Sequence, residues 1–455
     1  MFWVSVLRML RGWGMSEQLN SVPKYEAYKD SGVVWLGDVP EHWNINPGLT
    51  VFSENKRDNK GMKESQVLSL SYGNIVIKPP EKLVGLVPES FETYQLVEPG
   101  DIIIRCTDLQ NDKTSLRTGL AKDTGIITSA YINLKVKKGQ CSKYWHYYLH
   151  SIDTTKVLYK FGSGLRQNLS FLDFKRLPVF DVGYDEQSAI VTFLDKKTKK
   201  IDQAVTTKEQ QIILLKERKQ ILIQNTVTRG LNPDAHMRDS CVDWIGEIPV
   251  HWNVKRAKYL FTEVDERSVA GEEELLSVSH MTGVTPRSER NVYMFMAEDY
   301  SGSKTCQKND LVFNIMWAWM GALGVADRPG IVSSSYGIFR QLITNTFNSK
   351  FLEYLLKTTG YIEHYNKVST GLHSSRLRFY SHMFFNMELG YPSKNEQDEI
   401  IDCIEVESNK IDNAINLQQQ QIEHLKEYKV TLINSAVTGK IKVPRVVETE
   451  SEGVA

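Results

Sequence analysis

Two glycine-containing loops hold the side chains best suited to binding chemistry in this chain. GSGLRQNLS begins at Gly162 and STGLHSSRLR begins at Ser369, and both combine basic side chains with hydroxyls and amides or a histidine. Lysine and arginine bind phosphate oxygens, arginine, glutamine, asparagine and serine also bond base edges, and glycine lets the backbone come close. One such loop is weak evidence, because charged runs are usually solvated surfaces. Its recurrence in both halves of the chain favours contact with DNA.

The candidate DNA contacts are the basic, amide, hydroxyl and histidine side chains in and beside these loops. In the first half they are Arg105, Lys160, Ser163, Arg166, Gln167, Asn168 and Lys175. In the second half they are Lys367, Thr370, His373, Ser374, Arg376 and Arg378. The two loops differ at their centres, which is expected if the two halves read different bases.

Sequence patterns of catalysis and cofactor binding are missing. The chain has no GxxxxGK[ST] phosphate loop, no glycine-rich cofactor turn and no Asn-Pro-Pro-aromatic tetrad for a flipped adenine. His146 and His150 are four residues apart, but Tyr147 stands where a HExxH zinc motif has glutamate, so packed or surface histidines are the simpler interpretation. We therefore expect no catalytic residue, metal or cofactor in this chain.

The amino-acid composition limits how the protein could bind nucleic acid and where it is expected to reside. The 455 residues contain 55 Lys plus Arg and 55 Asp plus Glu, so affinity for nucleic acid must come from local patches. The five cysteines form no CxxC pair, which argues against a zinc site or disulfide framework and favours a reducing compartment, the cytoplasm. The longest uncharged run, Leu311 to Ala326, is shorter than the ~18 apolar residues of a membrane span and predicts a buried strand followed by a turn.

The chain contains an internal repeat that begins with a tryptophan box. DSGVVWLGDVPEHWN, from Asp30 to Asn44, recurs 209 residues later as DSCVDWIGEIPVHWN, from Asp239 to Asn253. Equivalent boxes could offer equivalent docking surfaces to two copies of one partner, or their tryptophans could simply cap the domain cores. The tryptophans concerned are Trp35, Trp43, Trp244 and Trp252.

A second repeat predicts two long helices. The segments from Glu186 and from Glu396 run for more than forty residues without Pro or Gly, and apolar residues three, four and seven apart form one stripe on each. At 1.5 Å per residue each helix would be roughly 60 Å long, and a single stripe of that length needs a partner in a coiled coil. Net charges of +4 (nine basic, five acidic residues) and −6 (three basic, nine acidic) favour pairing of the two helices with each other. The matched stripe includes Ile201, Leu215, Leu222, Ile411, Leu425 and Leu432.

The segments between the repeats share a skeleton but not a sequence. Each has an acidic turn before an apolar strand, a second strand, an aromatic helix and the glycine-containing loop, so the predicted fold class is α+β. We expect two globular domains separated by two long helices in an antiparallel coiled coil, with an internal pseudo-two-fold repeat. The expected divisions are a disordered extension 1–23, a first domain 24–185, a first helix 186–231, a second domain 232–395, a second helix 396–440 and a flexible tail 441–455.

These features together resemble the specificity subunit of a type I restriction-modification system. The resemblance rests on the paired WLGDVPEHW and WIGEIPVHW boxes, the duplicated helices and the divergent domains between them, and covers Tyr25 to Pro444. It implies two target recognition domains, each reading half of a bipartite sequence in double-stranded DNA, and a coiled coil that measures the unread spacer. It also implies two modification (methyltransferase) subunits as partners, joined by restriction subunits, with S-adenosylmethionine, ATP and Mg on those partners.

Two other classes stay open at this point. One is a stand-alone methyltransferase or nuclease, against which the missing catalytic and cofactor motifs argue. The other is a scaffold whose coiled coil spaces two binding modules without recognising DNA. Absence of S-adenosylmethionine binding by the purified chain would exclude the first, and failure to bind any duplex at low salt would favour the second.

Overall fold

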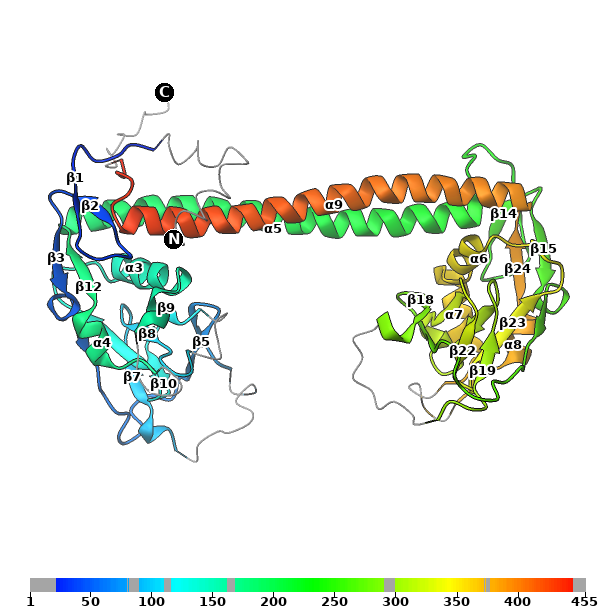
Figure 1. Cartoon of the computed structure of the whole chain (residues 1–455), viewed down its shortest axis with the longest axis horizontal. Helices are drawn as coiled ribbons and strands as arrows, with labels where there is room; N and C mark the ends of the chain where they lie inside the picture. The colour runs from blue at the N-terminus through cyan, green and yellow to red at the C-terminus, as the bar shows by residue number, and fades with distance from the viewer. Residues whose placement is uncertain are drawn as a thin grey trace, which may run out of the picture. The chain divides into compact units, whose positions relative to one another are not determined.

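The computed structural model describes residues 22–79, 81, 90–109, 116–161, 168–289, 299–371, 373 and 377–444. These residues form two compact units. Unit 1 contains the described residues up to Glu209 and from Gln419, and unit 2 contains those from Gln210 to Gln418. The long helices α5 (Tyr184–Arg229) and α9 (Lys394–Val437) each contribute to both units (Figure 1).

Unit 1 is built from antiparallel strands covered by short helices. Its main sheet has four strands in the order β4-β11-β8-β9, and four strand pairs surround it: β1-β2, β3-β12, β5-β6 and β7-β10. The helices are α3 (Ser142–Thr154) and α4 (Phe171–Arg176). The strands are β1 (Tyr28–Asp30), β2 (Asp38–Pro40), β3 (Asn44–Pro47), β4 (Phe52–Glu54), β5 (Leu68–Ser71), β6 (Asn74–Ile77), β7 (Gln95–Val97), β8 (Ile102–Ile104), β9 (Thr118–Leu120), β10 (Gly125–Ile127), β11 (Ile132–Val136) and β12 (Pro178–Asp181).

Unit 2 repeats this plan strand for strand. Its main sheet has the order β16-β23-β20-β21, and its strand pairs are β13-β14, β15-β24, β17-β18 and β19-β22. The helices are α6 (Ser349–Leu356), α7 (Thr359–Val368) and α8 (Ser381–Asn386). The strands are β13 (Met237–Asp239), β14 (Glu247–Pro249), β15 (Asn253–Arg256), β16 (Phe261–Glu263), β17 (Leu276–Ser279), β18 (Gly283–Pro286), β19 (Lys304–Cys306), β20 (Leu311–Phe313), β21 (Leu323–Val325), β22 (Gly330–Val332), β23 (Gly337–Gln341) and β24 (Glu388–Tyr391).

Each strand pairing of unit 1 recurs in unit 2 between the strands numbered twelve higher. Even isolated bridges recur, because the parallel bridge between Val67 and Ile126 has its counterpart between Leu275 and Ile331. The two segments that differ most in sequence therefore have the same topology. The predicted α+β class with an internal repeat is confirmed.

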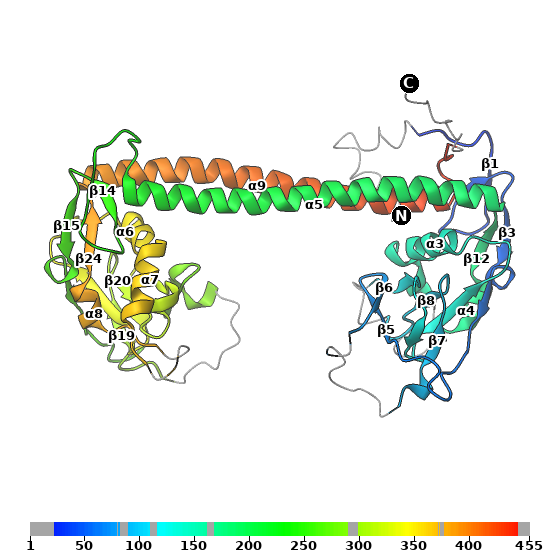
Figure 2. The same ribbon diagram turned by 180° about the vertical axis from the view of Figure 1, so that it is seen from behind.

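The core of unit 1 joins the strands to the long helices. On α3, Tyr144, Trp145 and Tyr148 are fully buried, and the hydroxyl of Tyr144 donates to the carbonyl oxygen of Val437 on α9 at 3.1 Å. Figure 2 shows α3 lying directly beside the helix pair within this unit. Because α3 presents aromatic rings to both sides, it connects the main sheet to the helices.

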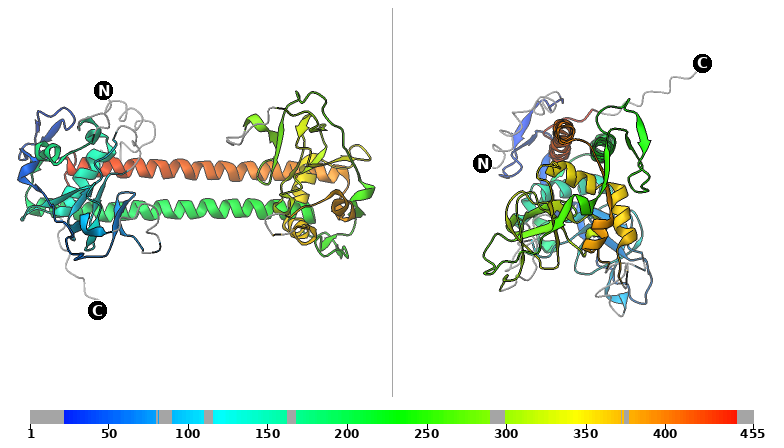
Figure 3. Two further views of the ribbon diagram at one scale, coloured as in Figure 1. Left: turned by 90° about the horizontal axis from the view of Figure 1, so that it is seen from below. Right: turned by 90° about the vertical axis from the view of Figure 1, so that its right-hand side faces the viewer.

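Within each unit the two long helices run antiparallel. In unit 1, Lys429 of α9 donates to Asp202 of α5 at 2.7 Å, and in unit 2, Lys219 of α5 donates to Asp412 of α9 at 2.7 Å. The residue numbers fall along one helix as they rise along the other, and Figure 3 shows the helices side by side in each unit. Of the predicted stripe, Ile201, Ile411 and Leu432 are buried and Leu215, Leu222 and Leu425 are half-buried.

Several boundaries differ from those expected from the sequence. The apolar segment from Thr124 forms two strands, β10 and β11, because the amide of Tyr131 bonds the carbonyl oxygen of Thr128 in a turn between them. The corresponding segment from Pro329 is divided in the same way. The run from Leu311 to Ala326 contains strand β20, the short helix η7 (Ala318–Met320) and then strand β21.

The residues after α9 pack against unit 1. Ile441 and Val443, assigned from the sequence to a flexible tail, are buried, and the amide of Lys442 donates to the carbonyl oxygen of Pro23 at 2.7 Å. The proposed N-terminal extension lies outside the described residues apart from Val22 and Pro23. Across the described ranges, no helix is both long and apolar enough to cross a membrane.

Candidate nucleic-acid interface

The first glycine-containing loop is anchored near a buried arginine, Arg117. Its guanidinium donates to the carbonyl oxygens of Arg105 at 3.3 Å, Thr107 at 2.8 Å and Asp108 at 3.2 Å. Its Nε donates to the hydroxyl of Tyr159 at 3.1 Å, just before the loop. Because the donors of a guanidinium have fixed directions, Arg117 holds the segment after β8 against the start of the loop.

Asp153 on α3 supports this arginine from the other side. Its carboxylate accepts a 2.6 Å hydrogen bond from the backbone amide of Arg117. Burial raises the pKa of Asp153, and its side chain is shielded from water. A buried carboxylate must have a hydrogen-bond donor, so Asp153 fixes the backbone of Arg117 to α3.

The far end of the first loop is tied to the same segment. The amide of Leu169 donates to the carbonyl oxygen of Cys106 at 2.9 Å, and the amide of Asp108 donates to Oδ1 of Asn168 at 2.9 Å. The sequence assigned the Asn168 side chain to base contact. Its oxygen accepts this hydrogen bond at the base of the loop, and the exposed side chain keeps its NH2 donors and a second lone pair on the oxygen for a base.

The second loop is attached by an equivalent backbone hydrogen bond, but a different pair of residues closes it at its base. The amide of Phe379 donates to the carbonyl oxygen of Ile315 at 3.0 Å, matching the bond between Leu169 and Cys106. Thr370 and Arg378 exchange backbone hydrogen bonds of 3.1 and 2.8 Å, which close the loop at its base. The side chain of Arg378 is half-buried.

The predicted DNA contacts fall into three groups. Exposed side chains, available to a ligand, are Lys160, Asn168, Lys175, Lys367, Thr370 and His373. Arg105 and Arg378 are half-buried. Ser163, Arg166, Gln167, Ser374 and Arg376 lie outside the described residues. The structure therefore brings the described candidates to the two loop bases, and their contact with DNA stays a prediction.

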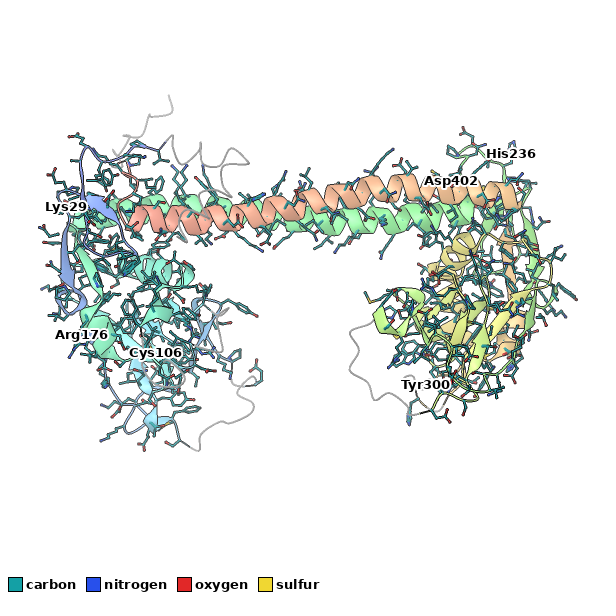
Figure 4. The ribbon with its side chains drawn as sticks, in the orientation of Figure 1. Lys29, Cys106, Arg176, His236, Tyr300 and Asp402 are labelled. Atoms are coloured by element: carbon teal, nitrogen blue, oxygen red, sulfur yellow. The ribbon has the colours of Figure 1, made fainter. Side chains whose placement is uncertain are left out.

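Lys175 is positioned by the short helix α4. The side chain of Asp173 accepts hydrogen bonds from the amide and hydroxyl of Ser170 at 2.7 and 2.8 Å, and so caps the helix start. The ammonium of Lys175 lies 5.1 Å from the ring centre of Phe171, a cation–π contact. Figure 4 labels Arg176, the next residue, together with Cys106 in the same unit. Two adjacent cations thus end a helix beside the loop.

Sequence reasoning missed Arg117, Asp153 and Tyr159. They are separated by more than thirty residues or lie on different elements, so no local spacing joins them. The one available signal was Arg117 itself, an arginine within the otherwise uncharged run TSLRTGL. A charge inside a strand-like run indicates a buried partner, because an unpaired buried charge is costly.

The box tryptophans divide into core and surface residues. Trp43 and Trp252 are buried in the cores of units 1 and 2, which removes both rings from any docking surface and corrects that part of the docking prediction. Trp35 and Trp244 are half-buried. Trp244 stacks on His364 with ring centres 3.7 Å apart. Docking through Trp35 and Trp244 stays a prediction.

The described residues contain no cluster of His, Cys, Asp and Glu that could hold a metal ion. Burial raises the pKa of Cys106 to about 12 and that of Cys306 to about 11, so both thiols stay protonated and poorly reactive. His146 and His150 are half-buried on α3, and burial lowers the pKa of both imidazoles.

The fold defines a class: a protein in which one α+β unit is built twice and both copies share a pair of antiparallel helices. No protein-family model and no curated protein sequence matches the chain. Solved structures do. A chain from a structure of complex assembly and conformational transition of the type I R-M system matches with a TM-score of 0.60 and 13% identity, over 88% of this chain and 98% of that one.

A second match is the HsdS subunit from Thermoanaerobacter tengcongensis. It has a TM-score of 0.52 and 12% identity, over 89% of this chain and 98% of that subunit. At these identities the likeness concerns the fold. The chain has the fold of an HsdS subunit, and the resemblance seen in the sequence is confirmed at that level.

Proposed function

We propose that this chain is the DNA specificity subunit of a type I restriction-modification complex. Each unit reads one half of an asymmetric bipartite target, and α5 and α9 set the spacer between the halves. The chain itself is not catalytic. It directs adenine methylation and ATP-dependent restriction by partner subunits.

One observation carries this proposal: the same loop attachment occurs twice with different side chains. The amide of Leu169 donates to Cys106, which follows β8, as the amide of Phe379 donates to Ile315, which follows the equivalent strand β20. The residues between differ, with RQN in the first loop where the second has HSS. A duplicated framework with diverged polar loops suits two readers of different base sequences, because base edges are distinguished by donor and acceptor pattern.

The partners and cofactors follow from the same proposal. Two modification subunits would bind the two repeats, and restriction subunits would join them. S-adenosylmethionine, ATP and Mg would be bound by those partners and not by this chain. The matching R-M chain comes from a structure concerned with complex assembly, which supports partners of this kind. The cytoplasm is the proposed location, in keeping with five free cysteines.

The alternative is a scaffold that spaces two binding modules without reading DNA. It explains the duplicated fold and the helix pair equally well. It does not explain why exposed cations lie at both loop bases, with Lys160 and Lys175 in unit 1 and Lys367 in unit 2, in a chain of zero net charge. Phosphate binding requires cations placed locally in this way.

The test is a methylation map. The chain is co-expressed with a modification subunit encoded beside it, and methylated adenines are located by single-molecule sequencing. We expect an asymmetric, gapped motif. Replacing residues 255–395 with the corresponding segment of another specificity subunit should change one half of the motif and leave the other half and the gap unchanged. An assembled complex that yields no motif and binds no duplex at low salt would favour the scaffold.

A further inference from the structure

Each unit presents a large, exposed apolar side chain at the tip of one β-hairpin. Tyr72 lies between β5 and β6 and is 90% exposed, and Met281 lies between β17 and β18 and is 81% exposed. The two positions are 209 residues apart, the same offset as the tryptophan boxes. Single exposed apolar residues are ordinary on protein surfaces, and this pair differs from the other exposed apolar residues in occupying equivalent hairpin tips of the two copies.

The backbone at Tyr72 makes this side chain more unusual. Tyr72 and Gly73 form a two-residue turn with φ values of 46° and 77°. Turns with two positive φ values favour Asn, Asp or Gly at the first position, because a bulky side chain is strained there. The ring of Tyr72 gains little from burial to offset that strain. A strained, exposed aromatic residue indicates a contact outside the chain.

The hairpin tip of unit 1 lies beside the clamp that anchors the glycine-containing loop. A Cβ atom on Gly73 would lie 3.1 Å from Cδ1 of Leu116, the residue before the buried Arg117. Arg117 in turn binds the carbonyl oxygens of Thr107 and Asp108 at the base of that loop. The tip and the loop base are therefore neighbours on one edge of the unit, where Figure 2 shows β5 and β6 close to β8.

Unit 2 places its hairpin at the same edge and adds aromatic residues. The backbone of Gly283 in β18 packs against Gly324 of β21, where an added Cβ would lie only 2.8 Å from the Cα of Gly283. The connection before β21 carries Trp317, 48% exposed, whose ring stacks on Trp319 with centres 6.0 Å apart. This connection also holds Ile315, which binds the base of the second loop.

We propose that Tyr72 and Met281 are DNA contacts that act beside the glycine-containing loops, each on the bases of its own half-site. This inference rests on the proposed function and deepens it. Apolar and aromatic side chains contact thymine methyl groups in the major groove, or enter between base steps in the minor groove. The loops supply hydrogen bonds and phosphate contacts, and the tips supply apolar contact, with Trp317 extending that surface in unit 2.

The test compares binding of variants to duplexes that carry the mapped target. The full chain is used in complex with the modification subunit, and affinity is measured by fluorescence anisotropy at fixed salt. We expect Tyr72→Ala to weaken binding roughly five- to a hundred-fold, the range for loss of one stacking contact, and to relax base preference in one half-site. Met281→Gln should have a comparable effect on the other half-site.

Matched variants separate contact from folding. Tyr72→Asn supplies a residue that the turn favours, so it should raise the stability of the hairpin while still weakening DNA binding. Leu49→Ala and Val269→Ala remove apolar residues that are 49% and 93% exposed away from the tips, and should leave binding unchanged.

Three outcomes would overturn the inference in different ways. If the wild-type complex binds its target and Tyr72→Asn and Met281→Gln bind equally well, the tips are not DNA contacts, while the proposed function stands. If these variants no longer bind the modification subunit, the tips contact protein. If the assembled wild-type complex binds no duplex, the proposed function itself fails.

Discussion

The indole Nε1 of Trp252 donates a 3.1 Å hydrogen bond to Oε1 of Glu396, the acidic residue in the first turn of α9. The other carboxylate oxygen of Glu396 lies 2.9 Å from Nε2 of His251. Unit 1 uses a related arrangement, since Glu186 in the first turn of α5 accepts from the hydroxyl of Tyr25 at 2.6 Å and lies 3.2 Å from His42. One glutamate thus fastens each tryptophan box to a long helix.

Replacing this glutamate should destabilise unit 2. Glu396→Ala leaves the buried indole NH of Trp252 without its acceptor and removes a negative charge from a helix N-terminus, for a loss of about 1–3 kcal/mol. His251→Ala should cost less than about 1 kcal/mol, because its pairing with the glutamate is at the surface, where the histidine side chain is 60% exposed. Hydrogen exchange of the backbone amides of the tryptophan box, followed in urea, measures the loss of stability in both variants. Glu399→Ala is the control, because Glu399 is exposed and lies three residues after Glu396 on α9. An equal loss of stability in this variant would contradict the role given to Glu396.

The box tryptophans should separate into folding and docking residues. Trp43 is fully buried against Phe180, with ring centres 5.0 Å apart, so Trp43→Ala should cost about 3–5 kcal/mol and lower the melting temperature of unit 1. Trp35→Ala should leave most of that stability and weaken binding of the modification subunit. Calorimetry and affinity measurement on the same samples distinguish the two effects. Unchanged subunit affinity in a folded Trp35→Ala variant would argue against docking through this box.

Much of this architecture could be predicted because it is periodic. The repeat offset identified the boxes, and apolar residues at helical spacing identified α5 and α9, since both signals are local in sequence. The diverged segments could be assigned to one fold class because alternating turns and apolar strands recur in the same order. The register of those strands could not be predicted, because it depends on pairing between distant segments.

The site was less predictable for a related reason. The clamp of Arg117, the residue before β9, joins the segment after β8 to Tyr159, and only the folded sheet brings them together. The sequence left open whether Trp43 and Trp252 cap the cores or dock a partner, since a tryptophan near prolines and charges is equally compatible with a surface or a core edge. Asn168 was correctly placed at the loop, but its hydrogen bond to Asp108 could not be foreseen.

Two half-buried histidines on α3 should make unit 1 sensitive to acid. Burial lowers the pKa of His146 from the usual 6.5 to about 3, with the charge of His150 as a smaller cause, and lowers that of His150 to about 4. The unfolded chain therefore binds more protons than the folded one below pH 6.5. The stabilisation is fully present above pH 6.5 and is lost as the pH falls towards 4, by about 1.4 kcal/mol per pH unit for each histidine.

A variant isolates this effect from the titration of carboxylates. His150→Leu replaces the imidazole with an apolar side chain that cannot bind a proton. It should remove the contribution of His150 to the pH dependence of the free energy of unfolding. Chemical unfolding of the wild type and the variant at pH 7, 6 and 5 gives the difference. The neighbouring charges, Lys143 and Lys122 near His146 and Lys429 near His150, stay the same in both proteins. Equal slopes for the two proteins would mean that His150 is protonated in the fold.

The loop side chains should divide by the way in which they affect DNA binding. Lys367 is exposed in the last turn of α7, before the second loop, and is suited to a phosphate. Lys367→Ala should weaken binding to all sequences alike and lower the slope of log affinity against log salt by about 0.9. Arg378→Ala should relax specificity at one base position by ~1–3 kcal/mol, because arginine binds the guanine edge with two hydrogen bonds.

Both variants should keep the folded loop, because the hydrogen bonds that close it do not involve the substituted side chains. The bridge between Thr370 and Arg378 is made by backbone atoms, and truncation of the Arg378 side chain leaves it in place. Binding to a panel of single-base substitutions, each at several salt concentrations, separates the two roles. Uniform weakening by Arg378→Ala with a reduced salt slope would assign that guanidinium to a phosphate, and the base-reading role would then fall to the residues between Thr370 and Arg378.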